Sequence, residues 1–501
     1  MPSRLALGVV CLVLLGAGRV AVGTEPDDTP PSAREDRRRE GRKEPRGGGS
    51  RLGNYTVPPP ANDVPPHPHT VILGRPTARG VTVRVRLRDR AEAFVEHGPS
   101  ADVLDGRTEA IPFAAGETHD FVLDGLAADA RHHYRLRYRS ADGAETAAPV
   151  ATFHTRRAEG SPFVFTVTSD SHLDENTSGA VYLRTLANAA ADRPDFHLEL
   201  GDTFMTGKYA RPEIAEAQYL AQRYYLGSLC HSAALFLVLG NHDGEGAGRR
   251  TTAWATATRK RLFPNPLPDG FYTGNDREEP DVGLPENHYQ WTWGDAQFIV
   301  LDPFRATTQR ARDGDGWAWT LGEEQYRWLR ESLAAVTPRY RFVFIHHLVG
   351  GAPPHSRGGI EAAPYWEWGG KGASGADEFA SRRPGWEAPI HDLLVRHGAS
   401  VVFHGHDHMF ARQELDGVVY QLVPQPGHRR AGHTQNAVEY GYLTGEIQPS
   451  SGHLRVRVAP EETRIDYVRA FLAPGDGGVA DGGAGVNAAV SFSSVVGPRP
   501  R

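Results

Sequence analysis

The stretch of sequence that decides the fold is FVFTVTSDSH, residues 163–172. Its first six residues are apolar or β-branched, a composition typical of a buried strand. The strand runs directly into Asp170 and His172, two side chains that can bind a metal ion. We therefore examined the later apolar runs for residues of the same kind.

Four later apolar runs also end in carboxylate, amide or imidazole side chains. These strand ends are Gly201-Asp202, Gly240-Asn241-His242-Asp243, His346-His347 and His404-Gly405-His406-Asp407-His408. In layered α/β proteins, ligands bind at the carboxyl ends of the strands. We therefore expect the five strand ends to converge on one site.

Helical stretches separate the strands, which predicts an α/β-type layered domain with buried strands. Strands are expected at 163–168, 196–200, 235–239, 342–345 and 401–403, and helices at 179–191, 212–226, 323–335 and 388–397. A hairpin is expected around a turn at 294–295, joining strands at 288–293 and 297–301. Further strands are expected at 418–423, 453–458 and 463–468, with a possible last strand at 489–496.

The composition excludes several kinds of site. The chain has 501 residues and two cysteines, Cys11 and Cys230, which rules out both a disulfide scaffold and a cysteine zinc cluster. The 23 histidines must then do any metal chemistry. Imidazole and carboxylate without thiolate suit Zn, Fe or Mn. The set is large enough for two ions, and a pair about 3.5–4 Å apart promotes displacement at phosphorus by generating hydroxide.

In sequence order, these motifs resemble those of the calcineurin-like metallophosphoesterases over about residues 161–425. The motifs are Asp170-x-His172, Gly201-Asp202, Gly240-Asn241-His242-Asp243, a histidine at a strand end, and Gly405-His406-x-His408. The resemblance implies two packed β-sheets flanked by helices. It also implies a metal-dependent phosphoric ester hydrolase that acts by metal-hydroxide attack, on monoesters or diesters.

The resemblance implies a role for each motif residue. One metal would be held by Asp170, His172, Asp202 and His408, and the other by Asp202, Asn241, His346 and His406. Asp202 would bridge the two ions, which would be Fe, Mn or Zn. His242 would be catalytic, protonating the leaving oxygen or stabilising its charge, and Asp243 would orient His242.

Not every histidine and carboxylate of these motifs is expected to bind metal. Alignment with the family favours His346 over His347 as the ligand, and His347 would then lie in an outer layer or face the substrate. His404 and Asp407 are expected to be structural.

The long segment 348–386 is rich in glycine and aromatic residues and is predicted to be a loop that walls the metal cleft. We assign tentative substrate contacts to His355, Trp366 and Trp368, together with His347. The alternative is a segment that packs on its own aromatic side chains.

The first 56 residues predict export. Arg4, the apolar run at 5–16 and a small-residue cleavage site at 21–23 are typical of a signal peptide over 1–23. The run is shorter than the roughly 18–20 residues of a membrane span, so no stable span is expected after cleavage. Residues 24–56 predict a disordered linker. The mature protein would be periplasmic, extracellular or at the cell surface.

The remaining domain boundaries follow from changes in pattern. Short strands over 57–157 predict an all-β sandwich, and LDGL at 123–126 before the strand at 133–138 resembles a fibronectin type III-like domain. A similar β-rich domain precedes the catalytic domain in purple acid phosphatases. The phosphoesterase-like domain would span 158–473, followed by a Gly-rich tail over 474–501.

Two other functions were weighed. An exported, non-catalytic binding or adhesion protein would act through the sandwich, but the intact ligand set argues against a retired enzyme. A secreted nuclease would be expected to carry a basic groove, whereas the net charge is -6, so no nucleic-acid partner is expected. The expected partner is a small phosphate ester, and the sequence does not set the oligomeric state.

The second motif predicts the visible spectrum of the protein. Purple acid phosphatases carry Asp-x-Gly at the first motif and a metal-binding tyrosine three residues after the bridging aspartate. Here those positions hold His172 and Met205. We therefore expect the iron-loaded mature protein to lack a purple tyrosinate-to-iron charge-transfer band. An absorption spectrum of the isolated protein that shows such a band would contradict this prediction.

Overall fold

The computed structural model describes residues 64–174, 176–208, 211–308, 315–429, 434–473 and 485–499. The predicted signal peptide at 1–23 and the predicted linker at 24–56 lie outside the described residues. No helix in the described ranges combines the length and the apolar character needed to cross a membrane.

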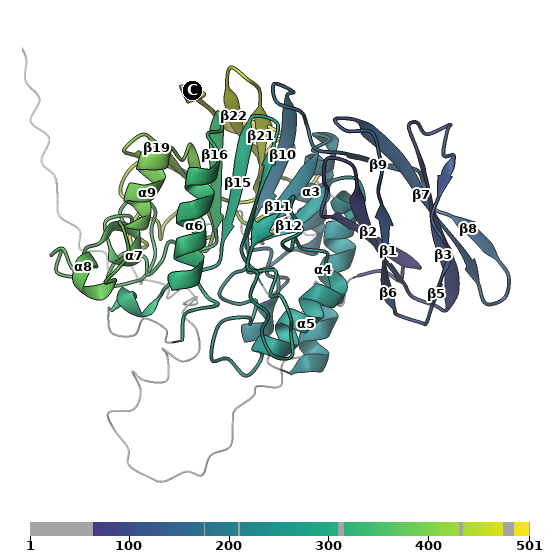
Figure 1. The fold of residues 1–501 in the computed structure, drawn as a ribbon, viewed down its shortest axis with the longest axis horizontal. Coiled ribbons are helices and arrows are strands. Elements are labelled where there is room, and N and C mark those ends of the chain that lie inside the picture. The colour runs from purple at the N-terminus through teal and green to yellow at the C-terminus, as the bar shows by residue number, and fades with distance from the viewer. Residues whose placement is uncertain are drawn as a thin grey trace, which may run out of the picture. The chain divides into compact units, whose positions relative to one another are not determined.

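The chain begins with an all-β region of two sheets, drawn in purple and blue in Figure 1. The first sheet contains β1 (His69–Gly74), β2 (Val81–Leu87) and β6 (Thr118–Leu123). The second contains β4 (Gly106–Arg107), β3 (Ala91–Gly98), β7 (Arg131–Ser140) and β8 (Glu145–Ala147), with β5 (Ile111–Phe113) on β3 and β9 (Ala151–His154) on β7. The predicted all-β region is confirmed, and its fibronectin type III-like character stays a prediction.

Strand β2 is buried on both faces, although its alternating sequence predicts one solvated face. Arg84 pairs with Asp120 and donates a hydrogen bond to the backbone oxygen of Lys260. The buried Arg223 donates to the backbone oxygen of Arg84 at 3.2 Å and to the hydroxyl of Thr70 at 2.9 Å. Arg84, a charged side chain of this face, is therefore paired inside the protein, which sequence periodicity cannot reveal.

Two further sheets form the centre of the larger domain. One sheet has the order β12 (Ala234–Leu237), β11 (Phe196–Glu199), β10 (Phe163–Thr168), β21 (Gly452–Val458), β22 (Thr463–Arg469) and β23 (Val490–Val496). The other has the order β13 (Thr273–Gly274), β14 (Tyr289–Trp293), β15 (Ala296–Leu301), β16 (Tyr340–Ile345), β17 (Val401–His404), β19 (Val418–Leu422), β18 (Phe410–Leu415) and β20 (Glu446–Gln448). The predicted layered fold of packed sheets and helices is confirmed.

Helices cover the outer faces of the two sheets (Figure 1). On one side lie α3 (Gly179–Ala191), α4 (Pro212–Cys230) and α5 (Thr252–Leu262), whose apolar residues pack with those of β12. On the other side α6 (Glu323–Ala335) and α9 (Ile390–His397) pack on β15, β16 and β17. Helix α5 and strand β18 were not predicted from the sequence.

An aromatic core joins the two sheets face to face. Phe165 of β10 meets Phe298 of β15 edge-on, with ring centroids 5.3 Å apart. Phe344 of β16 stacks on Phe403 of β17 at 4.9 Å. These side chains are fully buried, and aromatic pairs at such distances add about 0.5–1.5 kcal/mol each beyond their area burial.

The strand directions bring the motif loops to one edge. Strands β10, β11 and β12 are parallel, and so are β15, β16, β17 and β19. The carboxyl ends of the parallel strands in each sheet therefore lie at the same edge, and the predicted ligands follow these strand ends. Strand β23 pairs with β22, so the last strand expected at 489–496, within the predicted Gly-rich tail, is confirmed.

Candidate metal centre

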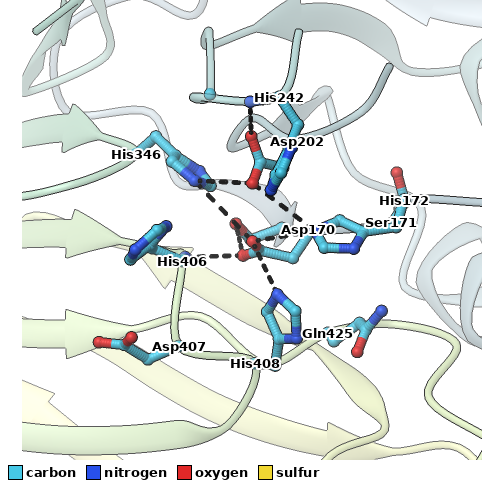
Figure 2. A network of polar contacts seen from close by, with 12 residues as sticks. Asp170, Ser171, His172, Asp202, His242, His346, His406, Asp407, His408 and Gln425 are labelled. Atoms are coloured by element: carbon cyan, nitrogen blue, oxygen red, sulfur yellow. Dashed lines mark hydrogen bonds and ion pairs between the residues drawn. The ribbon is translucent and has the colours of Figure 1, made fainter. Parts of the chain in front are cut away.

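The motif residues leave their strands through sharp backbone turns. Five of them adopt positive φ, which is uncommon for residues other than glycine: Asp170 at 59°, His172 at 51°, Asp202 at 51°, His406 at 79° and His408 at 56°. Such conformations cost energy and persist where the surrounding structure holds them, often at functional sites. The turns direct side chains from three strand ends towards one point, where His346, which follows β16, joins them (Figure 2).

The converging side chains form two groups that could each hold a metal ion. The first group is Asp170, His172 and His408, and the second is Asp202, His346 and His406. Within each group the candidate ligand atoms lie within 4.8 Å of one another. The two groups contain six of the seven predicted ligands.

Asp202 lies between the two groups. Its Oδ2 is 3.3 Å from Nε2 of His346 and 3.6 Å from Nε2 of His172. One oxygen thus faces an imidazole nitrogen of each group. This is the position that a bridging carboxylate needs.

Several buried atoms of the site make no hydrogen bond within the described part of the protein. Among the described residues, Asp170 Oδ1, His172 Nε2, Asn241 Oδ1 and His346 Nε2 are buried and make no hydrogen bond. Buried polar atoms are nearly always paired, so four orphaned atoms in one place indicate a missing ligand. The nitrogen and oxygen donors fit Mn, Fe or Zn. Asn241, the seventh predicted ligand, is among them.

Neighbouring groups aim these atoms at the site. His346 Nδ1 hydrogen-bonds the backbone oxygen of Leu200 at 2.9 Å, which leaves its Nε2 free to coordinate. Asp170 Oδ2 accepts hydrogen bonds from the Ser169 hydroxyl at 2.6 Å and the His406 N–H at 2.9 Å. Oδ1 is therefore the oxygen of Asp170 that remains for a metal ion.

Asp243 connects two of the motif loops. Its carboxylate accepts hydrogen bonds from the backbone N–H groups of Gly240 at 2.6 Å, Phe204 at 2.7 Å and Asp202 at 3.1 Å. These contacts give Asp243 a role in fixing the backbone around Asp202. Its orientation of His242 stays a prediction. The His242 N–H donates to Asp202 Oδ1 at 2.7 Å, and its ring centroid lies 5.8 Å from that of His172.

Comparison with known proteins agrees with this geometry. Residues 163–410 match the family model described as calcineurin-like phosphoesterase. The chain contains a calcineurin-like phosphoesterase domain. A search of curated proteins finds no match.

Two solved structures share the fold of this chain. The purple acid phosphatase PPD1 from yellow lupin (Lupinus luteus) seeds has 14% sequence identity and a TM-score of 0.57, covering 85% of this chain and 74% of its own. PhoD has 16% identity and a TM-score of 0.59, covering 88% of this chain and 91% of its own. At these identities the likeness concerns the fold.

The two tryptophans assigned to substrate contact are buried within their own segment. Trp366 is 2% exposed and donates from its indole to the backbone oxygen of Gly351, while Trp368 is fully buried and donates to the hydroxyl of Tyr420. These rings fill the interior of their segment, so the assignment of substrate contact to them is not supported. The segment itself contains short helices, α7 (Trp366–Gly369) and α8 (Phe379–Arg382), instead of the expected plain loop.

Three further histidines, His347, His355 and His404, differ in burial and in their contacts. His347 is buried, and its Nε2 faces the backbone oxygen of Ser356 while its ring lies 4.7 Å from that of His406. His355 is exposed. His404 is buried beside Tyr442. None of the three belongs to either ligand group found among the described residues.

Asp407 next to the ligands has structural contacts. It accepts hydrogen bonds from Arg357 at 2.6 Å and from the Tyr442 hydroxyl at 2.7 Å. These contacts agree with the structural role expected for it.

Sequence analysis missed Asp174 and Gln425. Asp174 Oδ2 lies 3.5 Å from His172 Nδ1 and 3.4 Å from the Lys208 ammonium, so it steadies a ligand histidine. Gln425 is fully buried just beyond β19. It follows an apolar strand, as the predicted ligands do, but an amide was not sought there.

The carboxylates and imidazoles of the site shift one another's pKa values in opposite directions. Burial disfavours a charged imidazole, but the carboxylates of Asp202 and Asp170 outweigh it and raise the pKa of His346 to about 9. Burial likewise disfavours a charged carboxylate, yet the facing histidines hold the pKa of Asp170 well below its usual range. His346 therefore carries a proton until a metal cation replaces it.

This exchange predicts how metal affinity depends on pH. Because His346 must lose its proton to coordinate, binding releases at least one proton below pH 9, and the apparent affinity rises with pH. We expect the affinity for Mn²⁺ to increase about tenfold per pH unit between pH 6 and 9 for each proton displaced. Competition with a chromophoric chelator measures it. An affinity that is constant over this range would contradict the prediction.

Proposed function

We propose that this protein is an exported, dinuclear metal-dependent phosphoesterase that hydrolyses small phosphate esters. The observation that carries the proposal is the pair of ligand groups that face one another across the Oδ2 atom of Asp202. The family match over 163–410 supports a phosphoric ester hydrolase as the reaction class.

The residues of each group have defined tasks in this proposal. Asp170, His172 and His408 hold one ion, His346, His406 and Asn241 hold the other, and Asp202 contacts both. Two such ions supply a nucleophile at neutral pH and neutralise the charge of a phosphoryl group. Mn, Fe and Zn all suit these donors.

His242 is the proposed proton donor. It follows the ligand Asn241, and its half-exposed side chain lies beside the ring of His172. The backbone bond to Asp202 holds it at the mouth of the site, where a substrate would present its ester oxygen. A histidine there can protonate the departing alcohol and so assist cleavage.

The substrate class and location rest on sequence. A net charge of -6 favours a small ester over a nucleic acid. The export pattern over 1–23 supports a location outside the cytoplasm. A buried free thiol at Cys230 is compatible with that location, because burial raises the pKa of the thiol and keeps it unreactive. Monoesters and diesters both remain substrates of this proposal.

Hydrolysis of simple esters tests the proposal. The mature protein, reconstituted with Mn, Zn or Fe, is expected to hydrolyse p-nitrophenyl phosphate or its bis-ester, and the ratio of the two rates assigns monoesterase or diesterase activity. Asp202→Asn removes the shared charge, so we expect initial rates to fall about 1000-fold or more.

A matched variant controls for the substitution itself. Asp416→Asn makes the same chemical change at a carboxylate that is 63% exposed, and its rate should equal that of the wild type. A metal-loaded wild type that turns over neither ester, or an Asp202→Asn variant of normal activity, would overturn the proposal.

The role of His242 predicts a dependence on the leaving group. Loss of a proton donor matters most when the departing alcohol is a poor leaving group. We expect His242→Ala to lower kcat about 100-fold with phenyl phosphate and clearly less with p-nitrophenyl phosphate. Steady-state kinetics on both substrates measure the difference. Equal losses on the two would assign His242 to charge stabilisation instead.

A further inference from the structure

Gln425 lies at the same sheet edge as the metal ligands. It follows β19, which runs parallel to β17 with Leu422 opposite His404. The chain beyond β17 carries His406 and His408, so the chain beyond β19 emerges beside them. Figure 2 draws Gln425 next to His408.

The side chain of Gln425 is fully buried and unsatisfied. Within the part of the chain that the structure describes, neither its Oε1 nor its Nε2 has a hydrogen-bond partner. The nearby Gln421 is equally buried, but its amide nitrogen donates to the backbone oxygens of Ala411 and Leu422, both at 3.0 Å. A buried amide with both atoms unpaired is unfavourable in a folded protein.

The backbone of Gln425 is fixed relative to the site. The Ser450 hydroxyl accepts a hydrogen bond from the Gln425 N–H at 3.1 Å and donates one to the backbone oxygen of His408 at 2.7 Å. Prolines at 424 and 426 restrict the chain on either side. The backbone oxygen of Pro426 also accepts a hydrogen bond from Thr185 at 2.6 Å. The unpaired amide is therefore held in place next to a ligand histidine.

We propose that Gln425 binds the phosphoryl group of the substrate, an inference that rests on the proposed function. When a substrate is bound, the Nε2–H group of Gln425 donates to a non-bridging phosphoryl oxygen, and its Oε1 accepts a hydrogen bond from a substrate hydroxyl. The substrate thus provides the hydrogen-bond partners that the amide of Gln425 lacks within the protein. A neutral amide suits this position because it adds a directed hydrogen bond without another charge near the metals.

The test is Gln425→Met, which keeps the length of the side chain and removes both polar atoms. In the metal-loaded protein we expect the inhibition constant of inorganic phosphate and the KM for p-nitrophenyl phosphate to rise about tenfold or more, as for a lost hydrogen bond to a charged group. We expect the Tm without phosphate to stay the same or rise, because an unpaired buried amide is removed. Bound metal, measured by elemental analysis, should remain unchanged.

Gln421→Met is the matched control. It makes the same change four residues earlier on β19, where the amide nitrogen is hydrogen-bonded although the amide oxygen is not. We expect it to lower the Tm and to leave the phosphate inhibition constant within twofold of the wild type. Gln425→Glu provides a second variant of nearly native shape, and its carboxylate should weaken phosphate binding more than methionine does.

Three outcomes would overturn the proposal: a phosphate inhibition constant within twofold of the wild type in both Gln425 variants, a loss of bound metal in Gln425→Met, or a lowered Tm with unchanged phosphate affinity. The first outcome would mean that Gln425 does not contact phosphate. The second would mean that it binds a metal ion, and the third that its role is structural. Failure of the proposed function is distinguishable, because the wild type itself would then hydrolyse no ester. Calorimetric binding of phosphate to the metal-loaded wild type and Gln425→Met would still decide the role of Gln425.

Discussion

The structure depends on keeping two carboxylates buried side by side. Asp170 is fully buried and Asp202 is 1% exposed, and burying a carboxylate without a compensating partner is costly. Backbone N–H groups satisfy one oxygen of each: His406 donates to Asp170 and His242 donates to Asp202. The other oxygens face imidazoles and must share a cation or protons with them. Loops from strands far apart in sequence therefore have to meet at one edge.

The aromatic core makes that meeting possible. Phe165 links β10 to β15, and Phe344 and Phe403 stack between neighbouring parallel strands. Glycines at the strand ends permit the close approach that follows. A side chain at Gly240 would place its Cβ 2.2 Å from the Asp202 nitrogen, and one at Gly405 would place it 2.1 Å from the Ser169 hydroxyl. Core packing thus sets the distance between the sheets. The glycines, which have no side chain, allow the ligand loops to approach one another closely.

Sequence alone predicted the parts of this arrangement that are local. The strand at 163–168 and the helices at 179–191 and 323–335 have the predicted bounds, because each has a clear period and clear ends. The ligand residues were found because metal-type side chains follow apolar runs. Contacts distant in sequence were not predicted: β2 is buried on both faces only because Arg84 and Arg223 find partners there, and Trp368 fills a core instead of meeting a substrate. Gln425 was not predicted because the sequence does not show whether a buried amide has hydrogen-bond partners, and only the described structure reveals that this one has none.

The hydrogen bonds of Asp243 have a consequence for how the centre acquires its ions. Because this carboxylate joins the backbone at Gly240 to that at Asp202 and Phe204, protein groups alone hold both loops in register. Metal loading is then the capture of ions by a preassembled cage, rather than a folding step that ions must trigger. If the chain is exported as proposed, it could cross the membrane without metal, fold, and bind its ions afterwards. The ions it carries would then reflect the supply in the compartment where it matures as much as the preferences of its ligands.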